Sequence, residues 1–150
     1  MSSTNRRFEA VVHPRMPKIT REHKPANYAV FSVIHDFGIT RFSPNIVIVW
    51  AAVYEVITHS ELSESPLEDV LMRLAENLPI GIDELRSRAT QGLRKMWNNC
   101  NEDYIIEKYY FYEQDRKVPR VDSGVDEFFR FVCKTAYMRR HGVGWRKGYM

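Results

Sequence analysis

The chain has 150 residues, of which 44% are hydrophobic and 27% charged, and it contains 7 glycines and 7 prolines. This composition predicts one globular domain and excludes a chain that is disordered throughout or collagen-like. The 22 Lys and Arg residues against 19 Asp and Glu give a formal charge of +3. That excess is too small to identify a nucleic-acid partner, so the positions of the charges must decide.

The two cysteines, Cys100 and Cys133, do not have the spacing of a metal site. Arg6 and Arg7 interrupt any apolar run near the start, so no signal peptide is predicted. We therefore expect a reduced, cytoplasmic protein. The most apolar stretch, residues 46–56, is much shorter than the roughly 20 residues of a membrane span. It predicts a buried helix, and we expect no membrane partner.

Residues 1–25 are basic and contain three prolines, which break regular elements. We predict a flexible basic N-terminal arm over 1–25 and a helical domain with a basic C-terminal tail over 26–150. The arm is either a solvated tail or a segment that contacts phosphates. Its cations are Arg6, Arg7, Arg15, Lys18, Arg21 and Lys24.

Helical periodicity begins at residues 26–37, and Gly38 follows as a stop signal. Ser43 and Pro44 form a helix-start signal, an N-cap followed by proline at the first helical position. The run after them, residues 46–57, is apolar on nearly every side. It predicts a central buried helix.

Ser65 and Pro66 repeat this start signal ahead of a third helix that ends near Asn77. After a short break with proline and glycine, an amphipathic helix begins at Asp83 and ends near Trp97. Two helices joined by a tight turn predict a helix-turn-helix.

Seven large apolar residues crowd positions 104–112. They can form core, a dimer interface or a stacking platform for single-stranded nucleic acid, and core is favoured because exposing them is costly. A loop over 118–124 precedes a last helix from Asp126 to Arg140, and Gly142 stops it. The basic tail after this helix is a solvated end or a phosphate-binding patch. The predicted fold class is all-α, with five or six helices.

The helix from Asp83 to Trp97 has one apolar face, formed by Ile82, Leu85, Ala89, Leu93 and Met96, and one polar, basic face. A recognition helix needs this division, because its polar face must meet base edges and phosphates, although the same pattern also suits an ordinary solvated face. We predict that Ser87, Thr90, Gln91 and Arg94 read bases and that Arg86, Arg88 and Lys95 contact phosphates. The first-turn acids Asp83 and Glu84 oppose this interpretation, because they repel phosphate.

Gly92 lies inside the same helix. Glycine there is less favourable than alanine by about 1 kcal/mol. The residue therefore indicates close packing of another backbone.

The segment Ile34-His35-Asp36-Phe37-Gly38-Ile39 resembles the Ile-His-Glu-Ile-Gly-Val signature of the DNA-binding effector domain of the sporulation master regulators of endospore-forming bacteria. The apolar helix at 46–57 and the helix ending at Trp97 stand where that family has its second helix and its recognition helix. Pro119 and the helix from Asp126 resemble its proline-containing loop and closing helix. The resemblance is to the effector domain alone, without the family's receiver domain.

The resemblance implies an all-helical fold with a helix-turn-helix, sequence-specific binding of double-stranded DNA and regulation of transcription. A homodimer suits two half-sites, and RNA polymerase or another protein is a further candidate partner. Aligned on Trp97, this chain has Glu84, Ser87, Thr90 and Gln91 where the family has Arg, Arg, Arg and His. A second hypothesis therefore stays open, a non-catalytic protein-interaction domain that kept the scaffold and binds through the Tyr-rich segment.

The five histidines are scattered and form no His-x-x-x-His pair, so we expect no metal site. His35, beside Asp36 near a helix end, fits a capping or interhelical hydrogen-bond group better than a catalytic one. No glycine-rich phosphate loop or nucleophile elbow occurs. We therefore expect a protein that is not an enzyme and has no cofactor.

Overall fold

The computed structural model describes residues 24–110 and 116–142, and within them it contains six α-helices, two short 3₁₀ helices and no strand. The all-α prediction is confirmed. The predicted arm up to residue 23, and the basic tail beyond residue 142, lie outside the described residues. The elements are α2 (Lys24–Asp36), α3 (Pro44–Thr58), η1 (Ser60–Leu62), α4 (Leu67–Ala75), α5 (Ile82–Asn99), α6 (Glu102–Tyr109), η2 (Val121–Ser123) and α7 (Val125–His141).

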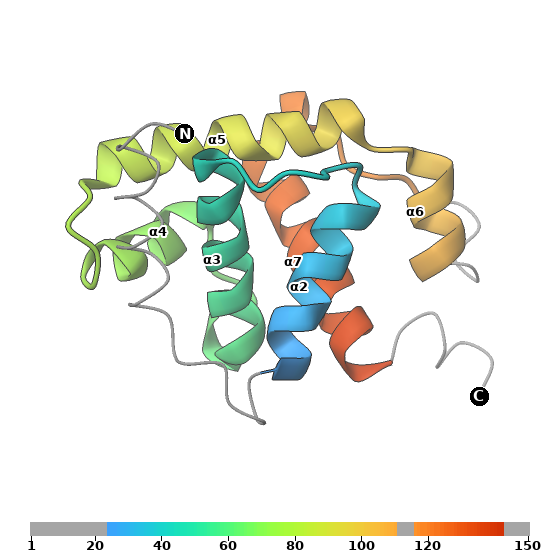
Figure 1. Cartoon of the computed structure of the whole chain (residues 1–150), viewed down its shortest axis with the longest axis horizontal. Helices are drawn as coiled ribbons and strands as arrows, with labels where there is room; N and C mark the ends of the chain where they lie inside the picture. The colour runs from blue at the N-terminus through green and yellow to red at the C-terminus, as the bar shows by residue number, and fades with distance from the viewer. Residues whose placement is uncertain (1–23, 111–115, 143–150) are drawn as a thin grey trace.

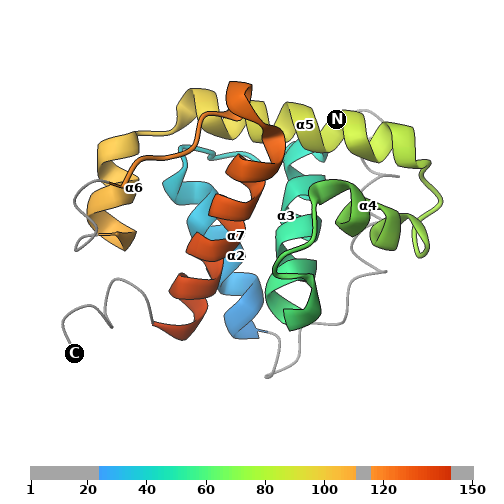
Figure 2. The same cartoon turned by 180° about the vertical axis from the view of Figure 1, so that it is seen from behind.

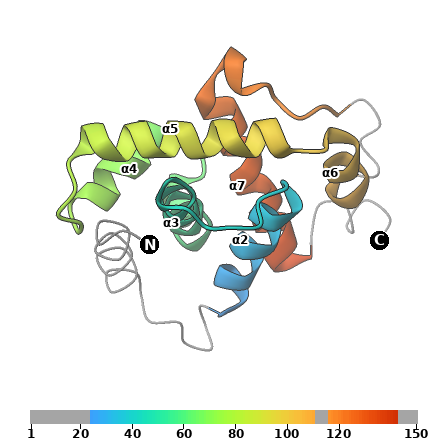
Figure 3. The same ribbon diagram turned by 45° about the horizontal axis from the view of Figure 1, so that its top comes forward.

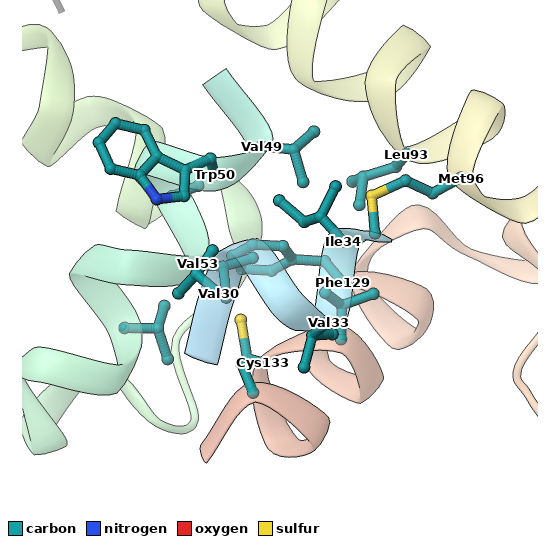
Figure 4. Packing of buried hydrophobic residues seen from close by; sticks show 14 of the residues in the cluster. Val30, Val33, Ile34, Val49, Trp50, Val53, Leu93, Met96, Phe129 and Cys133 are labelled. Atoms are coloured by element: carbon teal, nitrogen blue, oxygen red, sulfur yellow. The ribbon is translucent and has the colours of Figure 1, made fainter. Parts of the chain in front are cut away.

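Three helices, α2, α3 and α7, run side by side, and α5 lies across one end of them (Figures 1 and 2). The short helix α4 packs beside α3 beneath the N-terminal half of α5, and α6 follows the other end of α5. Apolar side chains from four helices meet between these layers, among them Ile34 from α2, Val53 from α3, Leu93 from α5 and Phe129 from α7 (Figure 4). The first residues of α2, Lys24 and Pro25, were predicted to belong to the arm and are helical instead.

The central buried helix is α3, as predicted. Ser43 caps it, because its side chain accepts a hydrogen bond of 3.4 Å from the backbone N–H of Ile46, and Pro44 occupies the first helical position. Every residue from Ile46 to Tyr54 is buried. This helix forms the middle of the core, and its first turn extends toward α5 (Figure 3).

The predicted cap of the third helix is wrong. The N-cap position of α4 is Pro66 rather than Ser65, and no side chain of the cap residue bonds to the helix. Asp126 of α7 takes over this role, since its Oδ1 accepts a 2.8 Å hydrogen bond from the backbone N–H of Leu67. A partner distant in sequence thus satisfies the helix start, and α4 ends at Ala75 instead of near Asn77.

Two glycines let α5 approach the segment between α2 and α3. Gly38 has φ +89°, and a Cβ there would lie 2.4 Å from the backbone oxygen of Asn99 at the end of α5. At Gly92 a Cβ would lie 2.7 Å from the backbone oxygen of Asn45 and 2.6 Å from Cγ2 of Val49. The prediction that another backbone packs against Gly92 is confirmed, and the partner is the first turn of α3.

The aromatic segment is partly core. Tyr109 and Tyr110 are buried, and the Tyr110 hydroxyl lies 2.9 Å from the Thr135 hydroxyl of α7. Tyr104 is 45% exposed. The predicted loop over 118–124 contains the 3₁₀ turn η2, and Gly142 ends α7 in the left-handed conformation with φ +64°, as its stop signal predicts.

Candidate functional site

The two faces of α5 lie where the sequence places them. The apolar face is buried, and among the predicted base-reading residues Ser87, Gln91 and Arg94 are exposed, whereas Thr90 is half-buried. Helix α5 lies across one end of α2, α3 and α7 (Figure 1), so its exposed face points away from them. A polar helix face that no other described element covers is the geometry that a groove-binding helix requires.

Arg86 is exposed, but carboxylates of α4 and α5 bind its guanidinium. Its Nε donates to Glu68 Oε2 of α4 at 2.8 Å, its Nη1 lies 2.8 Å from Asp83 Oδ1, and its Nη2 also donates to Glu68. The hydrogen bond from Arg86 lowers the pKa of Glu68. The bidentate hydrogen bonds between Arg86 and Glu68 join α4 to α5. They also occupy the guanidinium that was predicted to contact phosphate.

A chain of hydrogen bonds joins α3 to the polar face of α5. Arg88 donates through Nη1 to Asn45 Oδ1 at 3.3 Å, and Asn45 donates through Nδ2 to Gln91 Oε1 at 3.2 Å. Gln91 in turn donates through Nε2 to the Ser87 hydroxyl at 3.2 Å. Arg88 also lies 3.5 Å from Glu84 Oε1. Three of the predicted contact residues are therefore linked through a residue that was not predicted, Asn45.

Asn45 escaped the sequence analysis because nothing in its neighbourhood marks it as functional. The Ser43 and Pro44 signal places it in the first turn of α3, and Gly92 indicates a close approach to α5. Only the packing of α3 on α5 shows that the close approach brings the Asn45 amide to the polar face.

The exposed cations of the site lie toward the C-terminal end of α5. Arg94 and Lys95 are exposed, and neither forms an ion pair with any residue in the described ranges. Arg41 is also exposed and lies on the segment that contacts α5 at both of its ends, through Gly38 and Asn45. That segment runs along one side of α5 (Figure 3). The C-terminal half of α5 and the segment that runs beside it thus each carry exposed cations.

The opposite end of the same surface is acidic. Asp83 and Glu84 are exposed in the first turn of α5, with side-chain exposures of 92% and 55%. The neighbouring helix α4 exposes Asp69, and Glu76 follows it directly. A polyanion is repelled by this end and attracted by the other.

A second polar cluster ties α6 to α2. The Asp36 carboxylate is 8% exposed, lies 3.0 Å from Lys108 Nζ and accepts a hydrogen bond from the Tyr109 hydroxyl. Burial lowers the pKa of Lys108, but the bonds to Asp36 and Tyr104 outweigh it, so the pKa is raised. His35 was expected to cap the helix or to bond between helices, but it is exposed, and the residue that bonds to α6 is Asp36. The role of this cluster is to anchor α6 to α2.

In the part of the chain that the structure describes, no three His, Cys, Asp or Glu side chains converge as metal ligands. Burial raises the pKa of Cys100 to about 11 and also raises the pKa of Cys133. None of the described helices is both long and apolar enough to cross a membrane. No protein-family model matches the chain, and neither a curated protein nor a solved structure matches it.

Proposed function

We propose that this chain is a sequence-specific DNA-binding regulator of transcription in which α5 enters the major groove and α4 with α5 forms the helix-turn-helix. The observation that carries the proposal is the ordered amide of Gln91, which is held by Asn45 and Ser87 one turn before the exposed Arg94. Ordering side chains before binding reduces the entropy that binding must overcome.

The hydrogen-bonding capacity left on Gln91 matches one base. An amide side chain has two N–H donors and an oxygen with two lone pairs. Asn45 uses one lone pair and Ser87 accepts from one N–H, so one acceptor and one donor remain. Adenine presents the complementary pair in the major groove, the N7 acceptor and the N6 donor. We therefore assign Gln91 to an adenine and Arg94, beside it on the same exposed face, to a neighbouring base.

The charges orient the DNA on α5. Phosphates are repelled by the acidic end, where Asp69 and Glu76 form no ion pair with a described residue, and attracted by the end that carries Lys95 and Arg41. Because Arg86 and Arg88 have partners within the fold, we assign the phosphate contacts to Lys95 and Arg41 instead. A homodimer would place two such helices on two half-sites.

The test is a selection of bound duplexes from a random pool, followed by affinity measurements on the selected site. Gln91→Ala should cost about 1–3 kcal/mol on that site and relax the preference at one base pair. Asn45→Ala should relax the sequence preference at the same base pair, because it removes the hydrogen bond that holds the Gln91 amide. Asn77→Ala, which removes an exposed amide outside α5, is the matched control and should change neither.

Selection of no consensus, together with wild-type affinity equal to that for random duplexes, would overturn the proposal. It would favour the protein-interaction hypothesis. A consensus that survives unchanged in Gln91→Ala and Arg94→Ala would keep DNA binding but remove α5 from base reading.

A further inference from the structure

A groove lies between the C-terminal end of α3, the following turn η1, and the exposed face of α7. Its volume is about 520 Å³, within the range of sites that bind ligands or side chains of a partner. It is lined by Val56, Ile57, Ser60, Ser63, Glu64, Arg130, Cys133, Lys134 and Tyr137.

The groove has an apolar floor that an incoming side chain can reach. Val56, Ile57 and Cys133 line it while remaining 8%, 7% and 5% exposed. Tyr137, on the wall formed by α7, is 48% exposed. Tyrosine and arginine beside a desolvated apolar floor are the residue types that dominate binding energy at protein interfaces.

The rim of the groove is positively charged. Arg130 and Lys134 lie one turn apart on α7, are exposed, and form no ion pair with any described residue. Arg140 adds a third cation, because its Nη1 donates to the backbone oxygen of Ile57 at 3.2 Å. Of the described residues that line the groove, Glu64 is the one that carries a carboxylate. The lining thus carries two cations, Arg130 and Lys134, against one carboxylate, and Arg140 lies beside it, which favours an acidic occupant.

The groove and α5 lie at opposite ends of α3. The first turn of α3 contacts α5 through Asn45, whereas the groove begins at Val56. At about 1.5 Å per residue along a helix, these two contacts are separated by well over 10 Å. Because α5 lies at one end of α3 (Figure 2), an occupant of the groove at the other end would leave the polar face of α5 uncovered.

We propose that the groove docks an acidic amphipathic helix of a partner protein. The apolar side chains of that helix lie on Val56, Ile57 and Cys133, and its carboxylates face Arg130, Lys134 and Arg140. This is the helix-in-groove mode, in which apolar anchors recur every three or four residues. The inference is independent of DNA binding by α5.

The experiment selects binders from a random peptide library displayed on phage, using the full chain as bait. Enriched peptides should carry Leu, Phe or Trp at helical spacing with Asp or Glu on the flanks. Their affinity should fall at least tenfold for the double variant Arg130→Glu, Lys134→Glu. The matched control, Lys117→Glu with Arg120→Glu, reverses two exposed charges in the segment before α7 and should bind as the wild type does.

Two results would overturn the proposal. One is a selection without acidic, amphipathic enrichment, or with peptides that bind the groove variant and the wild type equally. The other is a dimer of the free chain, seen by sedimentation, that dissociates in the groove variant, since the occupant would then be a second copy. Amide shifts on peptide addition should be confined to the C-terminal end of α3, η1 and α7, and shifts centred on α5 would also contradict the assignment.

Discussion

The two halves of α5 carry similar numbers of basic side chains and use them in opposite ways. In the N-terminal half, Arg86 is bound to Glu68 and Asp83, and Arg88 to Glu84 and Asn45. In the C-terminal half, Arg94 and Lys95 face solvent without an ion pair among the described residues. A count of cations along a helix therefore overstates the charge available to a polyanion, because some of that charge holds neighbouring helices in place.

The largest expected effect comes from the point where the two halves meet. Gly92→Ala would place a Cβ 2.7 Å from the backbone oxygen of Asn45, so α3 and α5 must separate. Such overpacking costs about 1–3 kcal/mol, offset in part by the roughly 1 kcal/mol that alanine gains in a helix. The variant should unfold at a lower urea concentration, and it should also lose DNA affinity because Asn45 and Gln91 move apart.

The control for this prediction is Gly81→Ser. Apart from its chain neighbours, no described residue has an atom within 4 Å of a Cβ at Gly81, which occupies the N-cap position of α5. Serine is favoured at that position by a few tenths of a kcal/mol, so the variant should be as stable as the wild type or slightly more stable. Equal urea midpoints for Gly92→Ala and wild type would contradict the close packing of α3 on α5.

The distinction between bound and available cations extends to Lys108 on α6, which is bound to Asp36. Burial and the hydrogen bond to Asp36 raise the pKa of the neighbouring Tyr109 above 10.0, and the pKa of Lys108 is raised above 10.5. Above about pH 10 the unfolded chain loses these protons first, so the folded state holds more protons and stability falls as pH rises. For each of these protons, the free energy of unfolding can fall by at most about 1.4 kcal/mol per pH unit.

Urea unfolding between neutral and strongly alkaline pH measures this loss. Tyr109→Phe removes one of the two groups, so its stability should fall less steeply above pH 10 than that of the wild type. Tyr137→Phe removes a hydroxyl from a side chain that is 48% exposed and should leave the steepness unchanged. Identical profiles for Tyr109→Phe and wild type would show that the cluster on Asp36 does not contribute.

The sequence predicted the elements well where the information is local. The Ser43 and Pro44 signal, the apolar run of residues 46–57 and the stop at Gly142 each act within one helix, and each is confirmed. The start of α4 was assigned wrongly because its bond partner, Asp126, is 59 residues away. Charge pairing across helices is equally non-local, so the sequence could show that Arg86 is on the polar side of α5 but not that Glu68 binds it.

The smallest expected effect concerns the salt dependence of DNA affinity. It allows the two halves of α5 to be compared directly. Each phosphate contact contributes about 0.9 to the slope of log affinity against log salt concentration. Lys95→Ala should therefore reduce the slope on the selected duplex by about that amount, because Lys95 is available to a phosphate. Arg86→Ala removes a cation of equal charge from the same helix but should leave the slope unchanged, since Glu68 and Asp83 already neutralise it. Arg86→Ala should instead lower the urea midpoint of unfolding slightly. Equal slope changes in the two variants would mean that Arg86 leaves its carboxylates when DNA binds, and the division between the halves of α5 would then hold only for the free protein.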